Sequence, residues 1–190
     1  MADLQWGRVS SRQLYEAGAS GARITRWSRS GYLRRVLPRV YGVGHVAESV
    51  EADLMAAIHY AGPGAALSHS TALWWHELLE HRPARIAVST PHKCAPLAGV
   101  EVHARRRVEV VHRRRLPTTT VPQALLDFAA TAAISSVVRA LADLPKQGSK
   151  EPWKLRQNYA VDLRALRYGS LEDGAMTFSR RVPAAQKVPA

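Results

Sequence analysis

Three things are scarce in this sequence: cysteine, acidic residues and long apolar runs. A single cysteine, Cys94, in 190 residues excludes a disulfide scaffold and any metal site built only from cysteines. The most apolar stretch, residues 125–138, contains Asp127 and is shorter than the roughly 20 residues that span a bilayer. The first residues carry charge early and lack the apolar core of a signal peptide. We therefore expect a soluble, cytoplasmic protein.

The shortage of acidic residues leaves a strong positive charge. Lys and Arg total 27 against 15 Asp and Glu, which gives a formal net charge of +12. Arginine supplies 22 of these cations and lysine 5, and a guanidinium binds phosphate through two hydrogen bonds and reads guanine edges. The hydrophobic fraction of 46% is that of a globular chain rather than a disordered basic tail. Polyanions are the partners that such a charge favours.

The first 46 residues hold the signals of a small DNA-binding module. Ser10 and Gln13 form a capping box that opens one helix, and Ser20 caps a second helix after a short turn. Gly31 ends the second helix, and β-forming residues then surround a turn at Pro38. Helix, turn, helix and hairpin in this order predict a winged helix-turn-helix domain at residues 1–46. The helices are predicted over 11–17 and 21–30, and the strands over 32–36 and 40–43.

The helical wheel of the second helix separates an apolar arc from a basic one. Ile24, Trp27 and Ser28 share an arc, so we expect Trp27 to be buried between this helix and the hairpin. The opposite arc and the hairpin arginines are expected to face the same side, where they would contact DNA; the alternative is a solvated basic surface. The candidate DNA-binding residues are Ser20, Ala22, Arg23, Thr25, Arg26 and Arg29 of the helix and Arg34, Arg35 and Arg39 of the hairpin.

Base readout and phosphate binding fall to different parts of this candidate surface. Arg26 and Arg29 lie on the outward arc that a winged helix presents to the major groove, and they are expected to read bases. The hairpin arginines are expected to contact phosphate or the minor groove.

Residues 47–172 predict a second, mixed domain, so the fold class is α+β, with residues 173–190 a disordered tail. Ser68 is expected to cap one helix, and Thr120 with Gln123 to form another capping box. Residues 145–152 are expected to form a linker. The helices are predicted over 50–61, 68–79, 120–130, 135–143 and 155–167, and the strands over 84–90, 100–104 and 108–112.

Several groups resemble catalytic or metal-binding motifs and fail on spacing. His76 and His81 stand five residues apart, whereas a zinc-protease helix needs its histidines four apart on one face. Residues 62–64 form a Gly-Pro-Gly turn without the Lys-Ser/Thr of a phosphate-binding loop. Cys94, together with His92, His103 and His112, has no spacing typical of a metal site. We therefore expect no catalytic residue, no metal, no cofactor and no enzymatic activity.

Two arginine blocks, residues 105–107 and 113–115, flank a strand-like segment. They are typical of a second surface for a polyanion or an acidic partner protein. They are equally typical of solvated strand ends that keep an edge from pairing with other chains. The sequence leaves both interpretations open.

Three blocks of the chain resemble the AbiEi-family antitoxins of type IV toxin–antitoxin systems. The blocks are SGARITRWSRSGYLRRVLPRVYGVG at 20–44, ALSHSTALW at 66–74 and TTTVPQALLDFA at 118–129. The resemblance implies an N-terminal domain that binds DNA and represses its own operon, and a C-terminal domain concerned with antitoxicity. The implied partner is a nucleotidyltransferase-like toxin encoded nearby.

The chain also departs from that family. Nine residues precede Ser10, so either the first helix of the module is shortened or the start codon is misassigned. The Vsr-like endonuclease domain of some relatives is not recognisable, since the acidic residues after 143 lack a Glu-x-Lys arrangement that would hold magnesium. The favoured function is a DNA-binding repressor. The alternatives are a nuclease-related protein or remnant without its Vsr-like endonuclease domain, and a basic RNA-binding protein.

Overall fold

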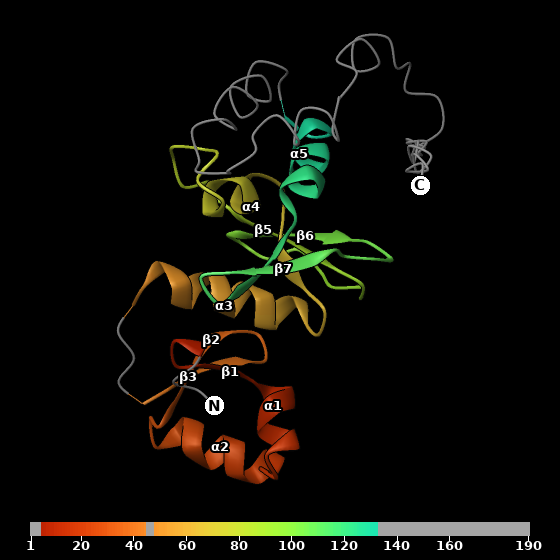
Figure 1. Ribbon diagram of the computed structural model, residues 1–190. Helices are drawn as coiled ribbons and strands as arrows, with labels where there is room; N and C mark the ends of the chain where they lie inside the picture. The colour runs from red at the N-terminus through yellow and green to blue at the C-terminus, as the bar shows by residue number, and fades with distance from the viewer. Residues whose placement is uncertain (1–4, 45–47, 133–190) are drawn as a thin grey trace, which may run out of the picture. The chain divides into compact units, whose positions relative to one another are not determined.

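The computed structural model describes residues 5–44 and 48–132, which lie in one compact unit spanning Met1–Pro152. These residues form helices and two sheets, and the expected α+β class is confirmed (Figure 1). The predicted domain boundary at 46/47, the helices at 135–143 and 155–167, the linker at 145–152 and the tail at 173–190 lie outside the described residues. None of the helices that the structure describes is long and apolar enough to cross a membrane.

A three-stranded antiparallel sheet and two helices make up residues 8–43. The chain runs through β1 (Arg8–Ser10), α1 (Ser11–Glu16), α2 (Gly21–Arg29), β2 (Leu33–Leu37) and β3 (Val40–Val43), with strand order β1-β3-β2. The capping box at Ser10 is confirmed, because its hydroxyl accepts from the Gln13 N–H and the Gln13 side chain accepts from the Ser10 N–H. Ser20 caps α2 by accepting from the Arg23 N–H at 3.2 Å. The start of each helix is thus fixed locally, as the sequence predicted.

The second sheet has five strands in the order β6-β5-β4-β8-β7. Its central strand β4 is antiparallel to β5 and parallel to β8, while β5 and β6 are parallel and β7 and β8 form a hairpin. The elements are α3 (Val50–Ala61), β4 (Ala66–Leu67), α4 (His69–Trp75), β5 (Ile86–Thr90), β6 (Val100–Ala104), β7 (Val110–Arg113), β8 (Leu116–Thr119) and α5 (Val121–Ala129).

Helix α3 is buried along most of its circumference because both sheets contact it. Its apolar residues share one cluster with Val40 of β3 and Val88 of β5. A second cluster lies between α4 and α5 around Leu73 and Ala124, and a third joins α2 to the three-stranded sheet through Ile24. The three-stranded sheet therefore has α1 and α2 on one face and α3 on the other.

The structure corrects three local predictions. Helix α4 ends at Trp75 rather than Leu79, because His76 leaves the helix and its Nε2 lies 2.9 Å from the Thr119 carbonyl oxygen. Thr120 occupies its N-cap position without a side-chain cap bond, and Ser68 does the same. In place of a capping box, the amide of Gln123 donates to Asp127. The strands β1, β4 and β8 were not predicted.

Candidate nucleic-acid interface

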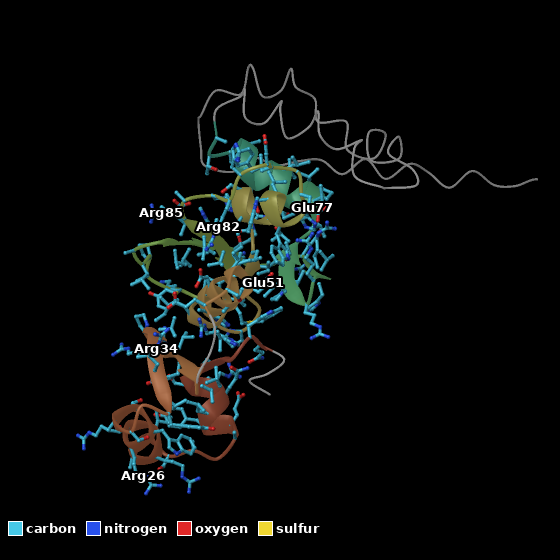
Figure 2. All side chains as sticks on the ribbon, turned by 90° about the vertical axis from the view of Figure 1, so that its left-hand side faces the viewer. Arg26, Arg34, Glu51, Glu77, Arg82 and Arg85 are labelled. Carbon is cyan, nitrogen blue, oxygen red and sulfur yellow. The ribbon has the colours of Figure 1, made fainter. Side chains whose placement is uncertain are left out.

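The outward face of α2 carries exposed basic and polar side chains. Ile24 is buried at 5% exposure and anchors the helix on the sheet, which leaves the opposite arc in solvent. Figure 2 shows Arg26 beside α2, pointing away from the ribbon. Among the described residues, no carboxylate lies within ion-pairing distance of the arginines of α2. The exposed residues are Ala22, Arg23, Thr25, Arg26 and Arg29, together with the capping residue Ser20.

Trp27 is only half buried, so the prediction that it is buried is wrong in degree. Its ring packs beside the exposed ring of Tyr32, with centroids 6.0 Å apart, and the Arg23 guanidinium lies 5.9 Å from its centroid. Ser28, assigned to the same arc, is exposed. Ile24 is the buried residue of α2, and Trp27 packs against the cluster around it while staying partly exposed. An aromatic edge therefore adjoins the basic face, and the wheel missed Tyr32 because it lies beyond the helix.

The arginines of strand β2 face opposite sides of the sheet, because side chains alternate along a strand. Leu33 is buried in the cluster beneath α2, and Arg35, two residues on, projects on the same face next to its cross-strand partner Tyr41. Arg34 projects on the α3 face, where its guanidinium lies 3.3 Å from the Glu48 carboxylate. Figure 2 likewise places Arg34 nearer to α3 than Arg26 is.

Arg39 lies apart from α2 as well. It occupies the tight β2–β3 turn with φ +64°, where its carbonyl accepts from the Ser11 N–H at 2.8 Å. It lines a hollow of about 790 Å³ that also involves His59 and Lys93. The expectation that all three hairpin arginines share the side of α2 is therefore not met, and Arg35 alone does so.

Three of the six arginines in the two blocks of the second sheet contact carboxylates. Arg105 contacts Asp127 at 2.5 Å. Arg113 pairs with Glu77 at 3.1 Å and donates from Nε to the Trp75 carbonyl at 2.9 Å. Arg114 also pairs with Glu77 and lies over the Trp75 ring. The acidic partners stand far away in sequence, so charge runs alone could not reveal them. Arg106, Arg107 and Arg115 stay exposed.

A buried polar cluster on the α4–α5 side of the second sheet is the other group that the sequence did not predict. The rings of His69 and His103 stack with centroids 3.7 Å apart. Burial, with His103 and Arg105 nearby, lowers the pKa of His69 to about 4, so this imidazole is neutral near pH 7. Burial raises the pKa of Asp127, although Arg105 opposes that shift. Within the described ranges, no three His, Cys, Asp or Glu side chains are grouped to hold a metal ion.

Comparison with known proteins found no matching family model. The FAD-containing monooxygenase EthA of Mycobacterium tuberculosis (strain ATCC 25618 / H37Rv) is 49% identical over 45 residues, which are 24% of this chain and 9% of that protein. The probable FAD-binding monooxygenase AlmA of Acinetobacter baylyi is 33% identical over 51 residues, 27% of this chain and 10% of the relative. The chain thus spans a tenth or less of these curated relatives, and so short a match does not bear on whether it is an enzyme.

One solved structure, the RV2827C protein from Mycobacterium tuberculosis, is similar over 82% of this chain and 71% of that chain. The sequence identity is 18% and the TM-score is 0.38. A likeness at this level does not establish a shared fold, and the chain is assigned to no family by these comparisons.

Proposed function

We propose that this protein is a DNA-binding transcriptional repressor whose α1–turn–α2 unit and β2–β3 hairpin act as a winged helix-turn-helix. One observation carries the proposal: α2 exposes Arg23, Arg26 and Arg29, and no carboxylate among the residues that the structure describes forms an ion pair with them. Guanidinium groups that are exposed and unpaired retain their hydrogen-bond donors for phosphate oxygens and guanine edges. The order of helix, turn, helix and hairpin supports the same function.

The chemistry of the α2 face suits the major groove. Arg26 and Arg29 lie three residues apart, so their side chains project from adjacent turns of one helical face. Thr25 uses its hydroxyl hydrogen on the Gly21 carbonyl at 3.0 Å, which leaves its methyl group free for apolar contact with thymine. Arg35 projects from the sheet on the same side and supplies a phosphate contact. Arg34 and Arg39 belong to other surfaces and take no part.

The antitoxin role rests on the resemblance of residues 20–44, 66–74 and 118–129 to the AbiEi-family antitoxins. In this proposal the protein represses the promoter of its own operon and counteracts a nucleotidyltransferase-like toxin encoded nearby. Co-expression with that neighbouring gene tests the second half. Rescue of growth by the wild-type chain supports antitoxicity, and growth arrest that the chain does not relieve contradicts it.

Fluorescence anisotropy against the promoter fragment and a scrambled duplex tests the DNA-binding half. Arg26→Ala and Arg29→Ala should each weaken promoter binding by about 1–3 kcal/mol and change scrambled-duplex binding little, because base contacts are lost. Arg34→Ala is the matched control: it removes the same charge from the α3 face and should leave the preference for the promoter intact. Equal losses of affinity for both duplexes would mean that α2 binds DNA only through its charge and does not read bases.

The same titrations separate the alternatives. A basic RNA-binding protein would prefer structured or single-stranded RNA over the promoter duplex. A nuclease would cleave the labelled duplex when magnesium is added. Either result would replace the repressor proposal.

A further inference from the structure

The strand β7 is an open edge of the five-stranded sheet. Within the described residues it pairs only with β8, so its outer side has no strand partner. Val110 and Val111 point to opposite faces of this strand, yet they are 39% and 37% exposed. Neither face of β7 is therefore fully covered. An edge with apolar side chains on both faces is a template for another strand.

The other edge, β6, differs in each of these respects. Its Val100 is buried, and Val102 packs against the core around α3. Val100 also forms a bridge with Leu97, so the chain folds over the start of this edge. Glu101 of β6 is held by Arg85 at 3.1 Å. The chain bridges the first residue of the β6 edge and packs its valines against the core around α3, whereas within the described residues β7 has neither feature.

The hairpin geometry determines which backbone groups of β7 face outward. Arg114 and Arg115 form a two-residue turn, so the flanking Arg113 and Leu116 are a hydrogen-bonded pair. The next pair, His112 with Pro117, is then a non-hydrogen-bonded pair, which agrees with the missing N–H of proline. The N–H and C=O groups of His112 and Val110 consequently point to the open edge.

The β7–β8 turn holds two arginines in a backbone conformation that is unfavourable for them. Arg114 and Arg115 have φ +47° and +66°, a conformation that glycine or asparagine adopts far more readily. Arg114 is engaged by Glu77, whereas Arg115 is exposed and has no carboxylate partner among the described residues. Strained non-glycine residues are maintained where their side chains have a task. At this turn the strain places a guanidinium at the tip of the open edge.

The charges around β7 select an acidic occupant. Arg106, Arg107 and Arg115 are exposed near its two ends, whereas Glu77 is already engaged by Arg113 and Arg114, which leaves Glu109 as the acid nearest to the strand in sequence. Val110 and His112 also line the hollow of about 790 Å³ whose other walls carry Arg39 and Lys93. A second copy of the chain would bring like charges together, so self-pairing is disfavoured. A strand with acidic side chains would be attracted.

We propose that β7 is a docking strand for an extended, acidic segment of a partner protein, which adds to the sheet as a sixth strand. Main-chain hydrogen bonds to Val110 and His112 would supply affinity, and the flanking arginines would supply selectivity. A nucleic acid is the less suitable occupant, because phosphodiester oxygens only accept hydrogen bonds and cannot donate to the outward C=O groups of Val110 and His112. This proposal is independent of DNA binding by α2.

A single backbone N–H provides the sharpest test. The probe is a fluorescein-labelled peptide of about eight residues, the length of a typical strand, that alternates Glu and Val. Anisotropy titration of the full chain should show saturable binding, which His112→Pro weakens by at least about tenfold through loss of the outward N–H. His112→Ala is the matched control: it removes the same imidazole but keeps that N–H, and it should bind like the wild type. Equal weakening by both variants would overturn the backbone pairing.

Further controls distinguish loss of binding from misfolding and from binding of another kind of partner. Thermal melts report whether His112→Pro still folds. The double variant Arg106→Glu/Arg107→Glu leaves the backbone intact; it should weaken binding of the Glu–Val peptide at low salt and make the protein prefer a Lys–Val peptide instead. Arg26→Ala should leave peptide binding unchanged even where it abolishes DNA recognition. In hydrogen–deuterium exchange, the Val110 and His112 amides should exchange rapidly in the free chain and become protected by the peptide.

Three further results would overturn the proposal. Protection of those two amides in the free monomer would mean that the chain covers its own edge. A concentration-dependent dimer that His112→Pro dissolves would mean that a second copy occupies β7. A duplex or RNA that competes for the peptide site and loses affinity with Arg106→Glu would make the edge a nucleic-acid surface.

Discussion

Helix α2 and the β7–β8 hairpin each carry three arginines, and the surroundings of the two sets differ. On α2, Arg26 and Arg29 project from a helix that contains no acidic residue. Around the hairpin, Glu77 engages both Arg113 and Arg114. Two charge runs that look alike in the sequence therefore differ in availability, because Arg113 and Arg114 are paired with a carboxylate and Arg26 and Arg29 are not. The tertiary position of a few carboxylates, rather than the number of arginines, decides which surface can bind a polyanion.

The largest effect should come from removing what holds α2 in place. Ile24 is buried beneath the helix, so Ile24→Ala should lower the free energy of unfolding of the region by about 2–4 kcal/mol. Trp27→Ala should cost less, about 1–2 kcal/mol, because its ring is only partly buried against the cluster around Ile24. Urea denaturation followed by circular dichroism measures both. A larger loss for Trp27→Ala than for Ile24→Ala would contradict the packing described.

A smaller loss of stability should follow removal of a paired arginine. Arg113→Ala deletes an ion pair to Glu77 and a hydrogen bond to the Trp75 carbonyl, and it should lower stability by about 1–2 kcal/mol. Promoter affinity should not change beyond a general weakening at low salt. Arg26→Ala should show the reverse pattern, with lost recognition and unchanged stability. Urea melts and promoter titrations on both variants give the comparison, and matching profiles would show that the two sets of arginines are not distinct.

The pH dependence of stability should originate in the second sheet rather than in the α2 region. Burial lowers the pKa of His69 from 6.5 to about 4, so the unfolded chain binds more protons than the folded protein between these values. Stability should therefore fall as pH is lowered from about 6.5 toward 4. Urea midpoints across this window measure the slope, which His69→Asn should reduce. A slope that the substitution leaves unchanged would assign the effect to another group.

The smallest effect concerns salt. Arg35→Ala should lower the slope of log affinity against log salt concentration by about one, because one phosphate contact is lost. Arg34→Ala and Arg39→Ala should leave that slope unchanged, since neither side chain projects on the α2 side of the sheet. Titrations of the promoter duplex at several salt concentrations measure all three variants. Equal changes would restore the sequence-based expectation that the hairpin arginines act together.

The elements that could be predicted are those fixed by local signals. The capping box at Ser10, the cap at Ser20 and the glycine that ends α3 at Gly62 gave helices with nearly the observed bounds. Two of the missed strands show no alternation of apolar and polar residues. Strand β4 is only two residues long, and β8 contains Pro117. Their existence depends on long-range pairing such as that of Leu67 with Thr118.

The sequence predicted which residues of α2 are exposed at the candidate site, but not where the arginines of the hairpin project. Outward exposure of Arg26 and Arg29 follows from helical periodicity alone. The placement of Arg34 and Arg39 depends on strand alternation, on a register shift between Arg35 and Leu37, and on what covers each face of the sheet. These are tertiary facts. For the same reason the stacking of His69 on His103, across 34 residues, gave no sequence signal.

The most direct measurement of the central claim is a site-specific photo-crosslink to the promoter duplex. A benzophenone amino acid is placed at Ala22 of α2, which leaves Arg26 and Arg29 intact, in one sample and at Arg106 beside β7 in another; both positions are exposed. We expect a promoter-specific crosslink from position 22 that unlabelled promoter suppresses and scrambled duplex does not, and no such crosslink from position 106. A promoter-specific crosslink from position 106 with none from position 22 would contradict the proposal that α2 binds the promoter.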